Sequence, residues 1–140
     1  MSITGTVPSP VTIPTESTRF VDLAGSVVAA GDWLTVLQES ETGELEQFHI
    51  RSPNTDFRVS MNVDGASVFS KTYDEIRMIS QNSPEIAAFA ELNEDGDATG
   101  YYVVSLRNIP YESSILVRMQ NTGLVPVTFS QLFAKYTIKE

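Results

Sequence analysis

The sequence contains one histidine and no cysteine, which limits the chemistry that its side chains can support. Nucleophilic catalysis needs a nucleophile and a base within hydrogen-bond reach. The one imidazole, His49, falls within an expected strand, out of phase with the apolar Phe48 and Ile50, so we expect it to face solvent. Without thiolates, one imidazole cannot form a zinc site. We therefore predict no catalytic residue, no cofactor and no metal, and expect a protein that is not an enzyme.

The acidic loop from Glu91 to Thr99 has oxygen-bearing residues at alternate positions and Gly96 at the sixth, like the start of a calcium-binding loop. The match is incomplete, because Glu91 stands where Asp is usual and Tyr102 stands where a bidentate Glu should close the site. We interpret the loop as a hairpin tip, and calcium binding is the alternative.

Three tyrosines, Tyr101, Tyr102 and Tyr111, lie close together in the sequence. Aromatic rings on one face of a sheet can stack on sugars, so a carbohydrate-binding platform is one interpretation. Packing within the domain is the other, since aromatic residues contribute much of the buried area of a core.

Length and charge narrow the class of protein. A chain of 140 residues with 41% hydrophobic content can bury one core without disulfides or metal. The formal net charge of −9 disfavours binding to a phosphate backbone, so nucleic acid is not an expected partner. No apolar run approaches the roughly 20 residues of a membrane span, and no signal-peptide pattern opens the chain. We expect a soluble protein with no membrane partner.

Residues 1–18 form a segment rich in Thr, Ser and Pro, with Glu16 as its one charged side chain. Such a segment cannot bury enough apolar surface to offset its ordering entropy, so we expect another polypeptide to hold it. Its prolines reduce the entropy lost on docking, which suits strand addition to a neighbouring subunit. The residues predicted to bind the partner are Ile3, Val7, Pro8, Pro10, Val11, Ile13 and Pro14. We call residues 1–18 the arm and predict a single domain over 19–140.

After the arm, short apolar runs alternate with turn residues at close intervals, which is typical of all-β proteins. We interpret Trp33, the one tryptophan, as a core anchor. Around Gln47, apolar residues alternate with polar ones as in a strand, with one irregularity in the alternation. The expected strands cover residues 19–23, 33–38, 44–51, 56–63, 66–71, 85–92, 101–107, 114–120, 124–129 and 131–138.

The strongest local prediction is a hairpin centred on Asp64-Gly65. Before it, Phe57, Val59, Met61 and Val63 alternate strictly with polar residues, as in a half-buried antiparallel strand. An Asp-Gly pair between two such runs favours a tight turn with positive φ at both central residues.

Other segments are less regular. Residues 72–80 fit either a helical turn or a strand end, and we leave them as a connection, while residues 108–111 are read as a loop. Pro126 places the strand over 124–129 at a sheet edge or beside a bulge. Eight to ten strands in about 120 residues predict an antiparallel two-sheet β-sandwich, jelly-roll-like, with an extended N-terminal arm.

From Thr42 to Lys135 the chain resembles small virion proteins of tailed bacteriophages. The resemblance lies in TGELEQFHIRS leading into DFRVSMNVDG, then a tyrosine-rich strand, a short polar loop and a closing strand with LFAKY. It implies a non-enzymatic β-sandwich that assembles by symmetry and often uses extended terminal arms.

We therefore expect a structural subunit of a virion, first of all a capsid decoration or cement protein. Its partners would be other virion proteins, from capsid or tail, and copies of itself in a homo-oligomer, for which the resemblance suggests a trimer. The alternatives are a head-tail or tail or baseplate component, a carbohydrate-binding β-sandwich at a receptor-binding tip, and a bacterial adhesion or polymer-surface module.

Overall fold

The fold comes from a computed structural model that describes residues 16–139. The predicted partner-binding residues of the arm lie outside the described residues; they are Ile3, Val7, Pro8, Pro10, Val11, Ile13 and Pro14.

Residues 16–139 form strands joined mostly by short turns, and one helix. The elements are β1 (Glu16–Asp22), β2 (Val27–Val28), β3 (Trp33–Glu39), β4 (Thr42–Ser52), β5 (Phe57–Val63), β6 (Ala66–Thr72), α1 (Tyr73–Ser80), β7 (Ile86–Leu92), β8 (Ala98–Tyr111), β9 (Ile115–Asn121), β10 (Val127–Thr128) and β11 (Gln131–Lys139).

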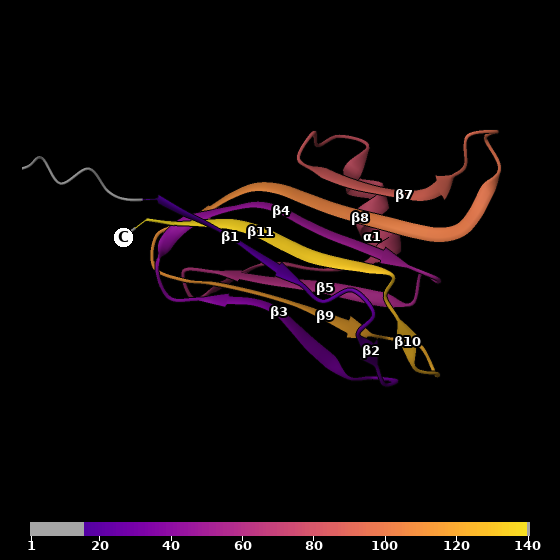
Figure 1. The fold of residues 1–140 in the computed structure, drawn as a ribbon, viewed down its shortest axis with the longest axis horizontal. Helices are drawn as coiled ribbons and strands as arrows, with labels where there is room; N and C mark the ends of the chain where they lie inside the picture. Colours follow the sequence, from indigo (N-terminus) through magenta and orange to yellow (C-terminus); the bar gives the residue numbers. More distant parts are fainter. Residues whose placement is uncertain (1–15, 140) are drawn as a thin grey trace, which may run out of the picture.

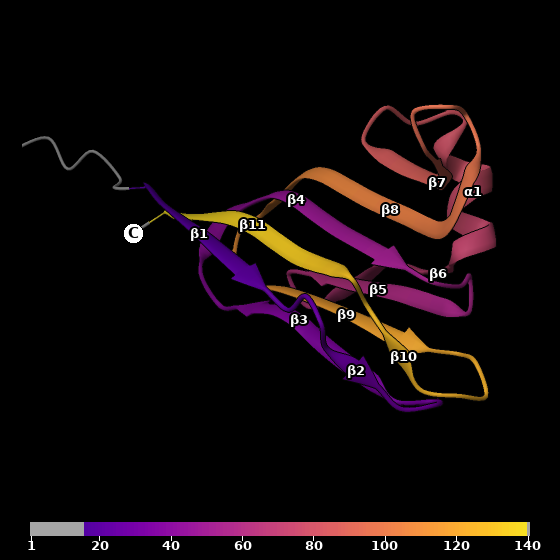
Figure 2. The same ribbon diagram turned by 45° about the vertical axis from the view of Figure 1, so that its right-hand side comes forward.

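The strands form two larger antiparallel sheets and one small one. The five-stranded sheet has the order β1-β11-β4-β8-β7, the four-stranded sheet has the order β3-β9-β5-β6, and β10 pairs with β2. The two larger sheets lie as two layers, with α1 at one end beside β7 (Figure 1; Figure 2). The prediction of a mostly antiparallel β protein is confirmed.

The core lies between these layers, and strand periodicity identified most of it. Phe57, Val59 and Met61 are buried on β5, and Ile115, Val117 and Met119 are buried on β9. On β11 the buried set is Leu132, Ala134, Tyr136 and Ile138, while Phe133 points to the other face, as predicted. The irregularity expected near Gln47 is also present, since the pairing of β4 with β11 shifts register there.

The hairpin between β5 and β6 is confirmed. Asp64 and Gly65 have φ of 54° and 82°, the conformation that a two-residue primed turn requires. The Asp64 carboxylate also accepts hydrogen bonds from the backbone N–H groups of Glu112, Ser113 and Ser114. These bonds, that from Ser113 first, hold the pKa of Asp64 below its ordinary value. The turn is therefore tied to the connection between β8 and β9.

Residues 73–80, left open as a connection, form helix α1. Thr72 caps it, because its hydroxyl accepts a hydrogen bond from the Glu75 N–H while the Glu75 side chain accepts one from the Thr72 N–H. This reciprocal capping box was present in the sequence as Thr-x-x-Glu and could have decided the assignment. Tyr73 and Ile76 bury the inner face of the helix in the core.

Two other expectations were wrong. Trp33 is not a core anchor: it is 43% exposed at the start of the edge strand β3, with the Arg118 guanidinium over its ring. Residues 108–111 are not a loop but the end of β8, paired with β4. Proline has no N–H to donate to a neighbouring strand. Pro110 is tolerated because β7 pairs with β8 only as far as Leu106, so no hydrogen bond between β8 and β7 is lost at Pro110.

The limits of β10 and β1 also differ from those expected. Of the run over residues 124–129, Val127 and Thr128 form β10, which follows Pro126 directly. At the other end of the chain β1 begins at Glu16, so the last three residues of the predicted arm pair with β11.

Candidate functional site

A cavity opens between the two sheets where the edge strands β6 and β7 face each other. It has a volume of about 200 Å³. Met61 of β5 and Leu106 of β8, each 1% exposed, belong to its lining, as does Val68 of β6, which is 57% exposed. The cavity thus leads from the surface into the core, and we call it the slot.

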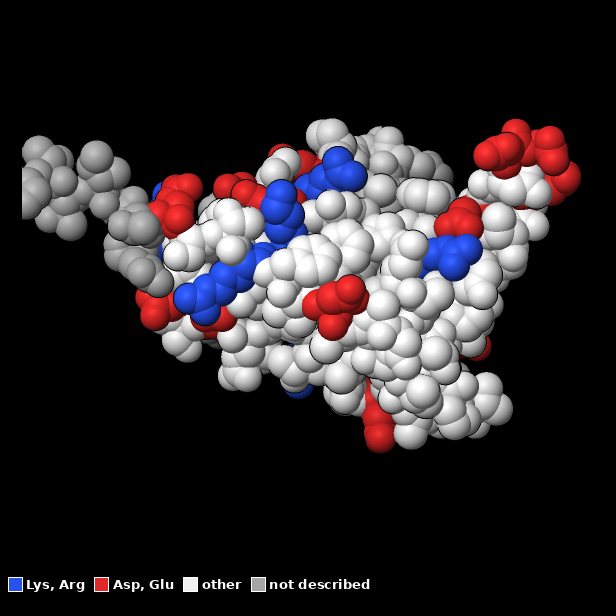
Figure 3. All heavy atoms as spheres, in the orientation of Figure 1, with Lys and Arg blue, Asp and Glu red and all other residues white. Residues whose placement is uncertain are grey.

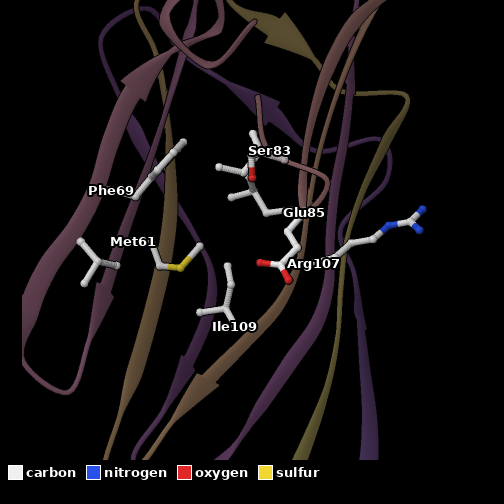
Figure 4. A pocket seen from close by; sticks show the side chains of 9 residues that line it. Met61, Phe69, Ser83, Glu85, Arg107 and Ile109 are labelled. Atoms are coloured by element: carbon white, nitrogen blue, oxygen red, sulfur yellow. The ribbon is translucent and has the colours of Figure 1, made fainter. Parts of the chain in front are cut away.

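The slot has an apolar wall and a polar mouth. Figure 4 shows Met61, Ile109 and the carboxylate of Glu85 turned toward one space, while Arg107 extends away from it. At about 200 Å³ the slot is smaller than the roughly 300 Å³ at which drug-sized pockets begin, so it suits one or two aliphatic side chains. The complete lining is Met61, Val68, Phe69, Ser83, Glu85, Ile86, Leu106, Arg107 and Ile109.

The strand beside the slot, β7, is an edge strand with one side unpaired. The backbone N–H of Arg107 donates to the carbonyl of Glu85, so the backbone of Glu85 points toward β8. Backbone groups alternate along a strand, and those of Ile86 and Ala88 therefore point to the free edge. The same residues turn their side chains inward, toward the slot and the core.

A polar cluster lies across the outer face of the five-stranded sheet. The guanidinium of Arg51 on β4 makes two hydrogen bonds to the carboxylate of Glu91 on β7, of 2.8 and 2.7 Å, and one of 3.0 Å to the Ser130 hydroxyl. Its Cζ lies 3.6 Å from the centre of the Tyr101 ring. The hydrogen bonds from Arg51 are the main cause that lowers the pKa of Glu91. Arg51 thereby joins the middle of the sheet to its β7 edge.

Tyr101 also borders a second cavity, of about 390 Å³, which we call the Tyr101 cavity. It mixes an aromatic ring with amide and hydroxyl groups, a combination that can hold a sugar or a short peptide. The lining residues are Pro53, Asn54, Tyr101, Pro126, Val127, Thr128 and Ser130.

The three tyrosines considered as a sugar platform are not brought together. Tyr111 is buried, and its hydroxyl donates to the carbonyl of Thr137 at 2.8 Å. Burial raises the pKa of Tyr111 to about 12. Tyr102 packs edge-on against Tyr73 inside the domain. Tyr101 alone borders a cavity, so the packing interpretation holds for the other two.

His49 lies on the outer face of the sheet, as its phase predicted, but it is half-buried in an aromatic row. Its ring stacks on Phe133 at 5.0 Å, and Phe133 stacks on Phe20 at 5.2 Å. The His49 Nε2 is 2.9 Å from the Oε1 of Gln131. Phe133 therefore has a ring on each of its faces, while Phe20 at one end of the row is 58% exposed.

The loop between β7 and β8 forms a hairpin tip, in which the Asn93 side chain accepts from the N–H groups of Asp95 and Asp97. Its acidic side chains project at the upper right of Figure 3. Within residues 16–139, no group of three or more His, Cys, Asp or Glu side chains is placed to hold a metal ion.

Comparison with known proteins finds no matching family model and no matching curated protein. In the part of the chain that the structure describes, no helix is long and apolar enough to cross a membrane.

Sequence reasoning missed the slot and the Tyr101 cavity, because each is made by strands that are distant in the chain. The open β7 edge had a sequence signal: the run IAAFA over residues 86–90 contains no charge and no proline, the residues that usually protect an edge.

Proposed function

We propose that the protein is a non-enzymatic structural subunit of a phage virion, a capsid decoration or cement protein that docks through its N-terminal arm. The observation that carries the proposal is the order of strands in the two larger sheets. Without β7, the five-stranded sheet reads β1-β11-β4-β8, and it lies over β3-β9-β5-β6.

This order supports the assignment of a jelly roll. The first and last long strands, β1 and β11, are neighbours, and strands close in sequence are divided between the two layers, as in two interlocked Greek keys. Jelly rolls are common in viral capsid proteins and in lectins. The fold agrees with the resemblance in sequence, while the choice between decoration and tail protein depends on which lattice the arm meets.

The position of β1 supports docking. It is an edge strand, and its first residue, Glu16, pairs with Lys139 of β11 at one end of the sheet (Figure 1). A segment that leaves from the end of a rigid sandwich can lie on a neighbour without disturbing its own core. We propose that virion proteins and further copies of the chain are its partners, and that the virion is its location.

The test is immunogold electron microscopy of phage particles from cells in which the protein carries a C-terminal epitope tag. Regular labelling over the capsid is expected. Labelling confined to the tail would move the assignment to a tail or baseplate component, and particles without label would contradict the proposal.

A second candidate is a carbohydrate-binding domain, favoured by the Tyr101 cavity. The Tyr101 ring is held by Arg51, and Asn54, Thr128 and Ser130 supply the polar groups that sugar hydroxyls need. Glycan-array binding by the full chain that is lost in Tyr101→Ala would support it. A Phe20→Ala variant is the matched control, since Phe20 is an exposed aromatic residue elsewhere on the sheet.

A further inference from the structure

We propose that the free edge of β7 and the slot beside it receive the arm of a second copy of this chain, paired antiparallel to β7. The inference rests on the proposed function, because it names the acceptor of an arm that docks. It is carried by the edge strands, by the direction of the backbone groups on β7, and by the pattern of residues in the arm.

Among the edge strands of the two larger sheets, β7 has the longest stretch without a protective feature. The edge strand β1 carries Glu16, Arg19 and Asp22. The edges of the other sheet, β3 and β6, each contain a bulge, at Val36 and at Val68. Charges and bulges are the usual means of preventing pairing at an edge. β7 has one charge, Glu91, and one register shift, between Ala90 and Leu92, and both lie near its end. From Ile86 to Ala90 it has neither, and its pairing with β8 is regular there.

The free edge imposes a condition on any added strand. Inward-facing Ile86 and Ala88 direct their backbone groups to this edge. In an antiparallel pair, directly opposed residues share a face and point their backbone groups at each other. An added strand must therefore use its inward-facing residues for the hydrogen bonds, while its outward-facing residues need no N–H.

The arm meets this condition when it is extended. All four of its aliphatic residues after Met1 are at odd positions: Ile3, Val7, Val11 and Ile13. All three of its prolines are at even positions: Pro8, Pro10 and Pro14. If the odd-numbered residues of the arm face inward, their aliphatic side chains face the slot. Each proline then occupies an outward-facing position, where a backbone N–H would point to solvent, so no hydrogen bond to β7 is lost.

This pattern also selects the direction of pairing. If the arm ran parallel to β7, the arm residues directly opposite Ile86 and Ala88 would point their backbone groups away from β7. The even-numbered arm residues would then have to make the hydrogen bonds to β7. Prolines at even positions could not donate there. Antiparallel pairing is therefore the arrangement that the sequence permits over residues 3–13.

The slot supplies the place for side chains. It lies beneath the edge, with Ile86 and Leu106 in its wall and Val68 on the opposite strand β6. An aliphatic side chain from the added strand would fill apolar space that now opens to the surface. A strand at the edge and a side chain in the slot are the two elements of recognition by strand addition.

The position of β1 favours a second copy over the chain's own arm. β1 and β7 are the two opposite edges of one sheet, and both run in the same direction. An arm pairing antiparallel to its own β7 would have to reverse at Glu16 and cross five strand spacings of about 4.8 Å each to reach the far side of β7. An arm from a neighbour needs no reversal and would link subunits head to tail, in a ring if the rotation closes.

The first test places one new proline in the arm of the full chain, at an odd or an even position. Ser9→Pro removes an N–H that must pair with β7, whereas Thr6→Pro removes one that faces solvent. Sedimentation equilibrium of the wild type should show self-association. The dissociation constant should rise at least tenfold in Ser9→Pro and change less than about twofold in Thr6→Pro. Equal effects, or a wild type that is monomeric at every concentration, would overturn the inference.

The second test alters the acceptor. Ala90→Lys puts a charge on the exposed end of the β7 edge, and Ala66→Lys puts the same charge on the exposed β6 edge as the matched control. Association should weaken at least tenfold in Ala90→Lys alone. If Ala90→Lys associates normally and still labels the capsid, the β7 acceptor is wrong while the virion function stands. If it associates normally and no variant reaches the particle, both are wrong.

Discussion

The two edges of the five-stranded sheet differ in how they are finished. At one edge, β1 carries charges of both signs, and Lys139 of β11 approaches Glu16 at 4.0 Å. At the other edge, β7 presents isoleucine, alanines and Phe89, with the slot opening beneath it. The edge at β1 carries charges, whereas the edge at β7, beside which α1 packs, has none from Ile86 to Ala90. Under our proposal the arm is the donor and β7 the acceptor, which is the arrangement that head-to-tail assembly needs.

The largest expected difference between the two edges concerns stability. Leu106→Ala removes a wall of the slot that is 1% exposed, so it should lower the free energy of unfolding by about 2–5 kcal/mol. Phe20→Ala on β1, at a side chain that is 58% exposed, should stay within about 0.5–1 kcal/mol. Urea unfolding measures both. Equal losses would show that Leu106 of β8, in the wall of the slot, contributes no more to stability than the exposed Phe20 of β1.

A smaller effect is expected from the helix beside β7. Thr72→Ala removes the hydroxyl that caps α1 and should cost about 1 kcal/mol, in the usual range of 0.5–2 for such caps. Ser80→Ala, at the other end of the helix, is the control, because the Ser80 hydroxyl bonds only to the Arg77 carbonyl of the same helix. Thermal unfolding should separate the two. A loss that is greater in Ser80→Ala would contradict the capping role.

The smallest effect is a pH dependence beside the β6 edge. The pKa of Asp64 is lowered in the folded protein by the backbone N–H groups around Ser113, so its ionised form favours folding. The stabilisation is fully present above the pKa of about 3.9 that Asp64 has in the unfolded chain. It is lost as the pH falls through the lower pKa of Asp64 in the folded protein. The Tm should therefore fall below about pH 4. Asp64→Asn, which tolerates the positive φ, should flatten that fall, and an unchanged profile would contradict this role of Asp64.

Sequence periodicity predicted the fold where one face of a strand is buried. The alternation over Phe57–Val63, the Asp64-Gly65 turn and the inward set of β11 all follow from a period of two and a known turn chemistry. Trp33 failed because burial of a large aromatic side chain depends on which layer covers its strand, and sequence does not show this.

The site was harder to predict than the fold. Met61, Val68, Ile86 and Leu106 come from four strands, and their meeting at the slot depends on sheet order. The arm pattern was visible, with aliphatic residues at odd positions and prolines at even positions, but it gains meaning only from the backbone direction at Ile86 and Ala88. Proposing β7 as the acceptor therefore required the structure, while the arm could be proposed as the donor from its composition alone.

The most direct test of the account is amide hydrogen exchange on β7 in the dilute and the assembled protein. The N–H groups of Ala87 and Phe89 point to β8 and should be protected in both states. Those of Ile86 and Ala88 point to the free edge, so they should exchange rapidly in the dilute protein and at least tenfold more slowly once the subunits assemble. Equal exchange of Ile86 and Ala88 in the two states would contradict the claim that β7 receives the arm.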